Sequence, residues 1–406
     1  MNQNIKNLYV IAQKPVRHIV GLMSGTSMDG LDVALCRIEG SGHKTKVALL
    51  HFDTVDYTDD IKDEIREVFA KQTIDFQHLT LLNAWLGKLH GEMVLSCLKK
   101  WGINTEGVDI VASHGQTVFH TPKILHKIDR FPNATLQIGD GDHVATTTGI
   151  ITISDFRQKH VAAGGEGAPL AVYGDYLIFS KKGENRIMLN MGGIANFTYL
   201  PASLDASAVF VTDTGTGNTL LDAVTRHYFP DKAFDKDAEI AKQGQVIPEL
   251  LMALKNNDFF EKPFPKTTGP ELFNIHYVDN SIQCAQLPNL STFDLMATLT
   301  RFSAETITEA IKKLFEAEKF DERTISDVKI YTSGGGARNP LLMDMIYELL
   351  PTPQYATTDD LHINPDAKEA VLFAILANEC VAGGTTDFGK RQGVPSVSMG
   401  KISFPN

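Results

Sequence analysis

The sequence has few cysteines and no long apolar run, and these two absences exclude several classes of protein. No stretch reaches the ~18 consecutive apolar residues of a transmembrane helix. The four cysteines form no CxxC pair, which argues against a zinc site and a dense disulfide framework. They are Cys36, Cys97, Cys284 and Cys380. We therefore expect a cytoplasmic protein with reduced thiols and without an export signal or membrane anchor.

Basic residues are also in deficit. The chain has 38 Lys and Arg against 49 Asp and Glu, a formal net charge of −11. This charge repels nucleic acids and acidic membranes, so we expect neither as a partner. With 43% hydrophobic and 21% charged residues, the 406-residue chain has an ordinary globular composition and room for two or three domains. Any phosphate ligand must be held by local groups.

Glycine is abundant and unevenly distributed. The 32 glycines gather in SGTSMDG, IGDGD, AAGGEGAP, NMGGIAN, DTGTGN and SGGGARN. Such clusters predict tight turns whose backbone N–H groups can form anion-binding concavities. In DTGTGN, a helix that begins near Asn218 would direct the positive end of its dipole toward the same point. The turn after 333 would form a platform for a purine and ribose.

The two halves of the chain follow the same order of elements. Each predicts a hairpin around a glycine turn, a third strand, helices, and a buried strand that ends in another turn. In the first half, these elements are strands at 18–23, 31–38, 46–52 and 108–113, helices at 61–70 and 79–99, and a turn at 114–117. In the second half, they are strands at 186–191, 194–200, 208–213 and 327–333, with helices from 218 and over 295–317. We predict an α/β protein of two related lobes, with an irregular insertion at 230–293 and a boundary near 150–160.

Two familiar nucleotide motifs are excluded. Residues 384–391, GTTDFGKR, differ from a P-loop at Arg391 and do not join a strand to a helix. No GxGxxG follows a strand, so a dinucleotide-binding fold lacks support. His114 and His120 are six residues apart and do not form a helical metal pair.

Seven segments together resemble the anhydro-N-acetylmuramic acid kinase family, within the sugar kinase, heat-shock chaperone and actin superfamily. They are GLMSGTSMDGLDVAL (21–35), SHGQTVFH (113–120), LQIGD (136–140), ISDFRQKHVAAGGEGAPL (153–170), LNMGGIANFTYL (189–200), DTGTGN (213–218) and SGGGARNPLLM (333–343). The resemblance extends from residue 21 to about 380. Family members usually have proline where Thr216 stands, and the first sixteen residues have no counterpart.

The resemblance implies an actin- and hexokinase-like ATPase architecture with an interlobe cleft. From the order of elements, we expect an N-terminal lobe over 1–154, a C-terminal lobe over 155–406, and a C-terminal helix over 365–382 near the hinge. The implied ligands are ATP, Mg²⁺ and an anhydro-amino-sugar substrate. The implied oligomeric state is a homodimer. The residues expected to bind the nucleotide are Ser24, Gly25, Thr26, Ser27, Met28, Asp29, Gly30, Asn190, Gly192, Gly193, Asp213, Gly215, Gly217, Asn218, Gly334, Gly335, Gly336 and Asn339, with Asp29 and Asp213 near the metal.

Asp155 is the candidate general base, by resemblance to the family's DFR motif. It ends the apolar run GIITIS and precedes a glycine-rich loop that we expect to close over substrate. The structural alternative is an ion pair between Asp155 and Arg157 at the strand end. By the same resemblance, the residues expected to contact the sugar are His114, Gln116, Thr117, Arg157 and Glu369.

The family's reaction opens a 1,6-anhydro sugar with water and phosphorylates the freed oxygen. The implied product here is N-acetylmuramic acid 6-phosphate, formed during recycling of the cell wall. Two alternatives stay open from the residues. One is a kinase for an ordinary sugar hydroxyl or a carboxylate, in which Asp155 would deprotonate the acceptor. The other is a non-catalytic sensor of sugar or nucleotide on the same scaffold.

Overall fold

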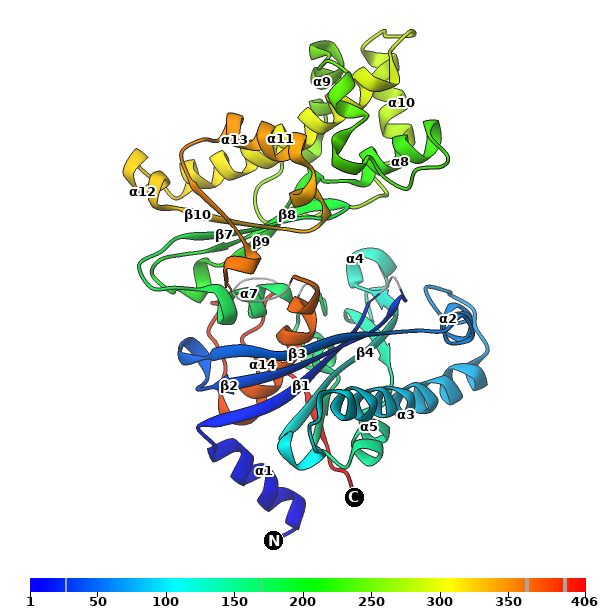
Figure 1. Ribbon diagram of the computed structural model, residues 1–406, viewed down its shortest axis with the longest axis vertical. Helices are drawn as coiled ribbons and strands as arrows, with labels where there is room; N and C mark the ends of the chain where they lie inside the picture. The colour runs from blue at the N-terminus through cyan, green and yellow to red at the C-terminus, as the bar shows by residue number, and fades with distance from the viewer. Residues whose placement is uncertain (26–27, 169, 362–364, 390–392) are drawn as a thin grey trace. The chain divides into compact units, whose positions relative to one another are not determined.

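The computed structural model describes residues 1–25, 28–168, 170–361, 365–389 and 393–406. The chain forms two compact units (Figure 1). Unit 1 contains Met1–Ser180, Leu204–Ala208 and His362–Asn406, and unit 2 contains Lys181–Ser203 and Val209–Leu361. The division therefore differs from the one expected between residues 154 and 155. Residues 155–180 stay with the first sheet, and the end of the chain returns to it.

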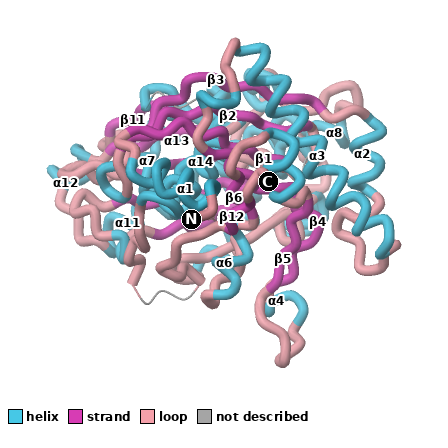
Figure 2. The backbone as a smooth tube through the Cα atoms, turned by 90° about the horizontal axis from the view of Figure 1, so that it is seen from below, coloured by secondary structure: helices cyan, strands magenta, loops and turns pink. Residues whose placement is uncertain are grey.

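Unit 1 is built on a mixed sheet with the strand order β12-β6-β4-β1-β2-β3. β1 to β3 form an antiparallel meander, β4 runs parallel to β1, and β6 runs parallel to β4. The strands are β1 (Val16–Ser24), β2 (Gly30–Glu39), β3 (Lys46–Asp56), β4 (Ile110–Thr121), β5 (Ala134–Ile138), β6 (Thr152–Ser154) and β12 (Lys401–Ser403). Figure 2 shows β12 beside β6. The last strand of the chain thus covers the edge of the first sheet.

Helices cover both faces of the unit 1 sheet because alternate residues of a strand point to opposite faces. Val20 and Leu22 of β1 join a core with α2 and α3, whereas Gly21 faces α14. A Cβ atom at Gly21 would lie 1.9 Å from the carbonyl oxygen of Ala370, so glycine allows the close approach of α14. The helices of unit 1 are α1 (Gln3–Gln13), α2 (Asp59–Arg66), α3 (Phe76–Trp101), α4 (Lys123–His126), α5 (Gly141–Thr148), α6 (Phe156–Ala162), α7 (Ala171–Phe179) and α14 (Lys368–Ala382).

Unit 2 repeats this plan. Its sheet has the order β11-β10-β7-β8-β9, in which β7 to β9 form an antiparallel meander and β10 and β11 run parallel to β7. The strands are β7 (Arg186–Met191), β8 (Ile194–Leu200), β9 (Phe210–Thr216), β10 (Lys329–Ser333) and β11 (Gln354–Thr357). Without β5 and β12, the first sheet has the same order and directions. The predicted α/β class with two related sheets is confirmed.

The insertion in unit 2 is more ordered than the sequence predicts. Phe273 and Phe302 belong to a separate apolar core that joins α8, α9, α10 and the first half of α11. The second half of α11 packs Ile307 and Ile311 against the sheet. The helices of unit 2 are α8 (Thr219–Tyr228), α9 (Pro248–Lys255), α10 (Ile275–Cys284), α11 (Thr292–Ala317), α12 (Glu322–Asp327) and α13 (Pro340–Leu349). The aromatic residues that make 230–293 look irregular therefore form its core.

The turn predicted at 114–117 is wrong. β4 continues through these residues to Thr121, because Gly115 adopts a positive φ of 76° and the strand then pairs with β5 from Gln116 onward. Of the first sixteen residues, 1–15 contain α1 and its connection to β1, and Val16 begins β1. Within the described ranges, no helix is long and apolar enough to span a membrane.

Candidate active site

Asp155 lies between β6 and α6 in unit 1. Its backbone is left-handed, with φ 61° and ψ 38°, a conformation that costs most residues ~1–2 kcal/mol and that aspartate tolerates better than most. Although it is the N-cap of α6, its side chain makes no capping hydrogen bond. Its Oδ2 instead lies 2.5 Å from Nζ of Lys401, whose backbone is opposite Ser154 in the β12–β6 pair. The carboxylate is therefore paired with a cation and does not cap its own helix.

Arg157 does not form the alternative ion pair with Asp155. Its Nε donates to Nε2 of His114 at 2.7 Å, and its Nη1 donates to the carbonyl oxygen of Gly167 at 2.6 Å. Since Nε2 of His114 accepts, Nδ1 carries the proton and donates to the carbonyl oxygen of Gly115 at 2.8 Å. Burial, and then the charge of Arg157, keeps the pKa of His114 well below its usual range. His114 is thus a neutral acceptor that orients the guanidinium.

The glycine-rich loop after α6 is fixed at one point in this structure. Gly167 donates its N–H to Nδ1 of His160 at 3.0 Å while its carbonyl accepts from Arg157. A Cβ atom at Gly165 would lie 2.2 Å from the His160 ring. Glycine therefore lets the loop pack tightly against His160, and closure of this loop over a ligand stays a prediction.

Glu369 is the second residue of α14. Its side chain is open to solvent, yet surrounding protein atoms desolvate it partly and raise the pKa of its carboxyl. The charges of Arg157 and Lys368 oppose this rise, and Asp32 adds to it. Asp155, Arg157, His114 and Glu369 thus all belong to unit 1, and Arg157 interacts with two of the others.

The first glycine turn follows β1. Of its predicted residues, Thr26 and Ser27 lie outside the described residues. Met28 has a positive φ of 58°, and its N–H donates to the carbonyl oxygen of Gly25 at 3.2 Å. Asp29 is exposed, and Gly30 begins β2.

Two residues predicted to contact sugar have other partners. Gln116 is fully buried, and its amide donates to the carbonyl oxygens of Gly25 and Thr117, each at 3.1 Å. The structure therefore places Gln116 beneath the first glycine turn and not at an open surface. Thr117 is half-buried, and its hydroxyl accepts from Gln137 at 3.2 Å.

In unit 2, the second and third glycine turns converge at the carboxyl ends of β7 and β10. A Cβ atom at Gly334, whose φ is 82°, would lie 2.7 Å from the carbonyl oxygen of Met191 and 2.8 Å from Oδ1 of Asn190. Asn218 donates from Nδ2 to that same carbonyl at 3.3 Å. Asn339, beyond Gly335 and Gly336, is the N-cap of α13. The carboxyl edge of a parallel sheet is the usual ligand site in such folds.

The amide groups at the start of α8 have partners within the protein. Gly217 and Thr219 donate to the carbonyl oxygen of Gly193 at 2.8 and 3.1 Å, and Asn218 donates to that of Gly192 at 2.9 Å. A Cβ atom at Gly217 would lie 2.3 Å from the Gly192 oxygen. These three N–H groups are therefore engaged within the protein, and the expectation that the dipole of α8 points at a phosphate stays a prediction. The two turns instead bind each other, which explains their glycines.

Asp213 is the second predicted metal residue. It lies inside β9 and does not end the strand, which continues through Gly215, at φ 146°, to Thr216. Its Oδ2 accepts from the N–H of Thr268 at 2.8 Å, and burial raises the pKa of its carboxyl to about 6. A cation beside Asp213 would offset the cost of burying this charge.

A metal site of several protein ligands is absent from the part of the chain that the structure describes. No group of three or more His, Cys, Asp or Glu residues is placed to hold an ion there. Mg²⁺ is commonly held by one or two carboxylates together with water and substrate phosphates. A single carboxylate such as Asp213 or Asp29 therefore fits that ion.

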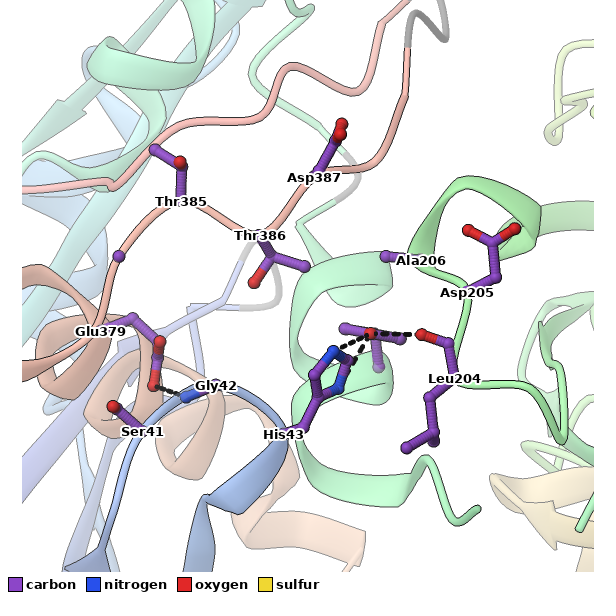
Figure 3. A pocket seen from close by; sticks show the side chains of 12 residues that line it. Ser41, Gly42, His43, Leu204, Asp205, Ala206, Glu379, Thr385, Thr386 and Asp387 are labelled. Carbon is purple, nitrogen blue, oxygen red and sulfur yellow. Dashed lines mark hydrogen bonds between the residues drawn. The ribbon is translucent and has the colours of Figure 1, made fainter. Parts of the chain in front are cut away.

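A separate pocket of about 430 Å³ lies in unit 1 (Figure 3). Residues 384–387, the beginning of the near-P-loop segment, form one wall. The lining includes the carboxylates of Asp205, Glu379 and Asp387, and the N–H of Gly42 donates to Glu379 at 2.9 Å. This negative lining is unsuitable for phosphate. It agrees with the exclusion of a P-loop from the sequence.

Sequence reasoning missed three residues that act on the site. Lys401 lies in a short C-terminal strand, and nothing in its local sequence indicates that it reaches Asp155. Tyr57 and His90 are buried near the first glycine turn, where the Tyr57 hydroxyl forms hydrogen bonds with both Ser24 and His90. His90 lies within the apolar periodicity of α3, where a buried histidine has no distinguishing pattern.

Comparison with known proteins gives consistent matches. The family model described as anhydro-N-acetylmuramic acid kinase matches residues 17–402. A protein of that name from Pseudoalteromonas atlantica is 56% identical over 100% of both chains. Another from Caldanaerobacter subterraneus is 40% identical over 97% of this chain and 98% of its own. Among solved structures, the activator of 2-hydroxyisocaproyl-CoA dehydratase from Clostridium difficile with bound ADPNP matches 90% of this chain and 95% of its own, at 12% identity and a TM-score of 0.36.

Proposed function

Because this chain belongs to the anhydro-N-acetylmuramic acid kinase family, we propose that it uses ATP to phosphorylate 1,6-anhydro-N-acetylmuramic acid. The reaction opens the anhydro ring with water and gives N-acetylmuramic acid 6-phosphate for peptidoglycan recycling. The observation that supports this chemistry best is the carboxylate of Asp155. It is paired with Lys401 and does not cap its own helix, so it is available to a reacting water.

Asp155 is the general base of the proposed mechanism. It takes a proton from water as the water oxygen forms a bond to C1 of the sugar. The bond between C1 and the bridging oxygen breaks, and that oxygen, O6, forms a bond to the γ-phosphorus of ATP while ADP leaves. In an inverting glycosidase, a second carboxylic acid protonates the leaving oxygen. Here the phosphoryl group takes the place of that proton.

Arg157 and Glu369 orient the sugar in this proposal. Two groups of Arg157 are engaged by His114 and Gly167, and no described residue forms a hydrogen bond with its Nη2. This arrangement presents a fixed cation to the lactyl carboxylate of the substrate. Glu369 is open to solvent, and its partly desolvated carboxyl suits hydrogen bonding to a sugar.

The glycine turns of unit 2 would hold the nucleotide, and the turn after β1 would hold its transferred phosphate. Asp213 or Asp29 would hold Mg²⁺, which supplies charge neutralisation on the transferring phosphoryl group. Since positioning and electrostatics dominate phosphoryl transfer, the role of the protein in this step is to align the sugar oxygen with the γ-phosphate of ATP. The family resemblance also supports a homodimer and a location in the cytoplasm. Analytical ultracentrifugation tests the first, and cell fractionation tests the second.

Oxygen-18 water provides the decisive assay. The protein is incubated with ATP, Mg²⁺ and the anhydro sugar, and the product is analysed by mass spectrometry. We expect a 6-phosphorylated sugar with one labelled oxygen at C1. A phosphorylated product in which the anhydro ring is intact would indicate an ordinary sugar kinase. No phosphorylated product, with nucleotide still bound, would indicate a sensor.

A further inference from the structure

A chain of buried hydrogen bonds connects α3 to the first glycine turn. Nε2 of His90 lies 2.7 Å from the Tyr57 hydroxyl, which lies 2.9 Å from Oγ of Ser24. Ser24 in turn donates to Oε1 of Gln116 at 2.5 Å. His90 and Gln116 are fully buried, and Ser24 and Tyr57 are almost fully buried. A buried hydrogen-bond network stabilises the fold only if each donor in it has an acceptor, because an unpaired buried polar group is costly.

The direction of every bond in this chain is determined by donor and acceptor chemistry. The amide nitrogen of Gln116 faces two carbonyl oxygens, those of Gly25 and Thr117, so its Oε1 must face Ser24 and accept. The single proton of Ser24 is then used on Gln116, and Ser24 must accept from Tyr57. The single proton of Tyr57 is used in turn, so Tyr57 must accept from His90.

His90 is therefore the neutral tautomer protonated at Nε2. Its Nδ1 is buried and has no hydrogen-bond partner among the described residues, as suits an unprotonated nitrogen. Burial lowers the pKa of His90 to about 4, so the ring stays neutral at physiological pH. The alternative tautomer would leave a buried N–H without an acceptor and the contact between Tyr57 and Ser24 without a proton.

Tyr57 also holds the other end of the turn. Its backbone N–H donates to the carbonyl oxygen of Asp29 at 2.9 Å, while its hydroxyl donates to Ser24. Gln116 adds a bond to the carbonyl oxygen of Gly25. One residue thus contacts the turn before it leaves the sheet and after it returns, and neither contact uses the turn's own N–H groups.

We propose that Tyr57 and His90 are positioning residues for the first glycine turn, acting through Ser24 and Gln116 to hold its two described ends, at 24–25 and 28–29, in place for binding the transferred phosphate. This inference rests on the proposed kinase function. A preorganised set of N–H groups is worth most where charge develops during transfer. A loosened turn should therefore weaken ATP use more than sugar use.

Tyr57→Phe removes the hydroxyl and keeps the ring. We expect the KM for ATP to rise about fivefold or more and kcat to fall, with the KM for the anhydro sugar within about twofold of wild type. Tyr173→Phe is the matched control, because it also removes a tyrosine hydroxyl bonded within unit 1, to the carbonyl oxygen of Pro395 at 2.7 Å. Equal behaviour of the two variants would overturn the proposal.

Two further comparisons separate positioning from general stability. If Tyr57 acts through Ser24, the double variant Tyr57→Phe with Ser24→Ala should be no worse than the worse single variant. Fully additive losses in kcat/KM for ATP would contradict this connection. His90→Gln keeps an N–H donor and should retain near-normal ATP use, whereas His90→Leu should resemble Tyr57→Phe. Normal ATP use by His90→Leu would exclude His90 from the role.

Nitrogen NMR of histidine-labelled protein tests the bond directions without any turnover. We expect His90 to show the Nε2–H tautomer with a slowly exchanging proton, and a changed Nε2 signal in Tyr57→Phe. An Nδ1–H tautomer would overturn the proposed chain. Titration with a nonhydrolysable ATP analogue separates the two levels of inference. If wild type binds the analogue but does not phosphorylate the sugar, the proposed function fails, and Tyr57→Phe is still expected to bind more weakly.

Discussion

Lys401 of β12 forms an ion pair with Asp155, and its Nζ lies 2.5 Å from Oδ2. The side chain of Lys401 is 64% exposed and that of Asp155 29% exposed, so this pair adds little stability, about 1 kcal/mol or less. Its value lies in geometry. The ammonium of Lys401 determines where the Asp155 carboxylate points. No capping hydrogen bond to α6 does so, although Asp155 is the N-cap of that helix.

Lys401→Met should therefore lower kcat with little effect on folding. We expect kcat to fall by about tenfold to a hundredfold, because displacing a catalytic base by about 1 Å has effects of that size. Lys401→Arg should restore most of the rate, since it keeps a cation of similar reach. Lys14→Met, which breaks another ion pair of unit 1, with Asp109, should leave kcat unchanged. An active Lys401→Met with normal kcat would show that the pair is only a surface contact.

Asp155→Asn should reduce kcat by about 10²- to 10⁴-fold, the usual contribution of a general base. Binding of a nonhydrolysable ATP analogue, measured by calorimetry, should be nearly unchanged. Asp142→Asn provides an exposed control on the neighbouring α5. Retention of the normal rate in Asp155→Asn would remove this residue from its role.

Stability of unit 1 should decrease as pH falls from about 6.5 to about 4. Burial lowers the pKa of both His90 and His160 to about 4, against ~6.5 in an unfolded chain. Between these values the unfolded state binds more protons, so the free energy of unfolding falls with falling pH, by about 1.4 kcal/mol for each pKa unit and histidine. Both tryptophans, Trp85 and Trp101, lie in α3, so their fluorescence follows unit 1 in urea titrations.

The variant His160→Asn should show a shallower dependence over this pH range. Its amide oxygen can accept from Gly167 as Nδ1 of His160 does, and asparagine does not titrate. His227→Asn, at an exposed site of unit 2, should keep the wild-type slope in tryptophan fluorescence. An unchanged slope in His160→Asn would mean that other groups control the acid response of unit 1.

Thr216→Val should stabilise unit 2 by about 1 kcal/mol. The Thr216 hydroxyl is fully buried and has no hydrogen-bond partner among the described residues, and an unpaired buried hydroxyl costs roughly 1–3 kcal/mol. Thr212→Val is the matched control on the same strand. The Thr212 hydroxyl accepts from the N–H of Lys266 at 3.1 Å, so its loss should destabilise. Calorimetry measures both, and a lowered melting temperature for Thr216→Val would contradict this account.

Much of the fold was predictable because it depends on local pattern. The alternation of apolar residues at Val33 and Leu35 and the glycine turn before them were sufficient to predict a hairpin, and unit 2 repeats the hairpin from Arg186 to Leu200. The continuation of β4 through 114–117 was not predictable. It depends on pairing with β5, about twenty residues later, which overrides the turn preference of Gly115.

The candidate site was predictable only where residues share a motif. Asp155 and Arg157 are two residues apart in sequence, yet each has a different partner from the one that proximity suggests. Lys401 and His114 approach them through the order of strands in the sheet, which no local pattern specifies. Likewise, the amides of the α8 start are taken by Gly192 and Gly193 because two turns pack together.

The return of the chain's end to unit 1 has a consequence for biosynthesis. α14, which carries Glu369, and β12, which carries Lys401, follow unit 2 in the sequence and are translated after it. The first 180 residues emerge from the ribosome with two surfaces still uncovered: the sheet face on which Gly21 lies, which α14 covers later, and the edge of β6. A nascent or truncated chain that ends before residue 368 therefore lacks both side chains and exposes apolar strand surface. Catalytic capacity should appear only after residue 401 has been translated, which makes shorter chains targets for chaperones and proteases and not partly active enzymes.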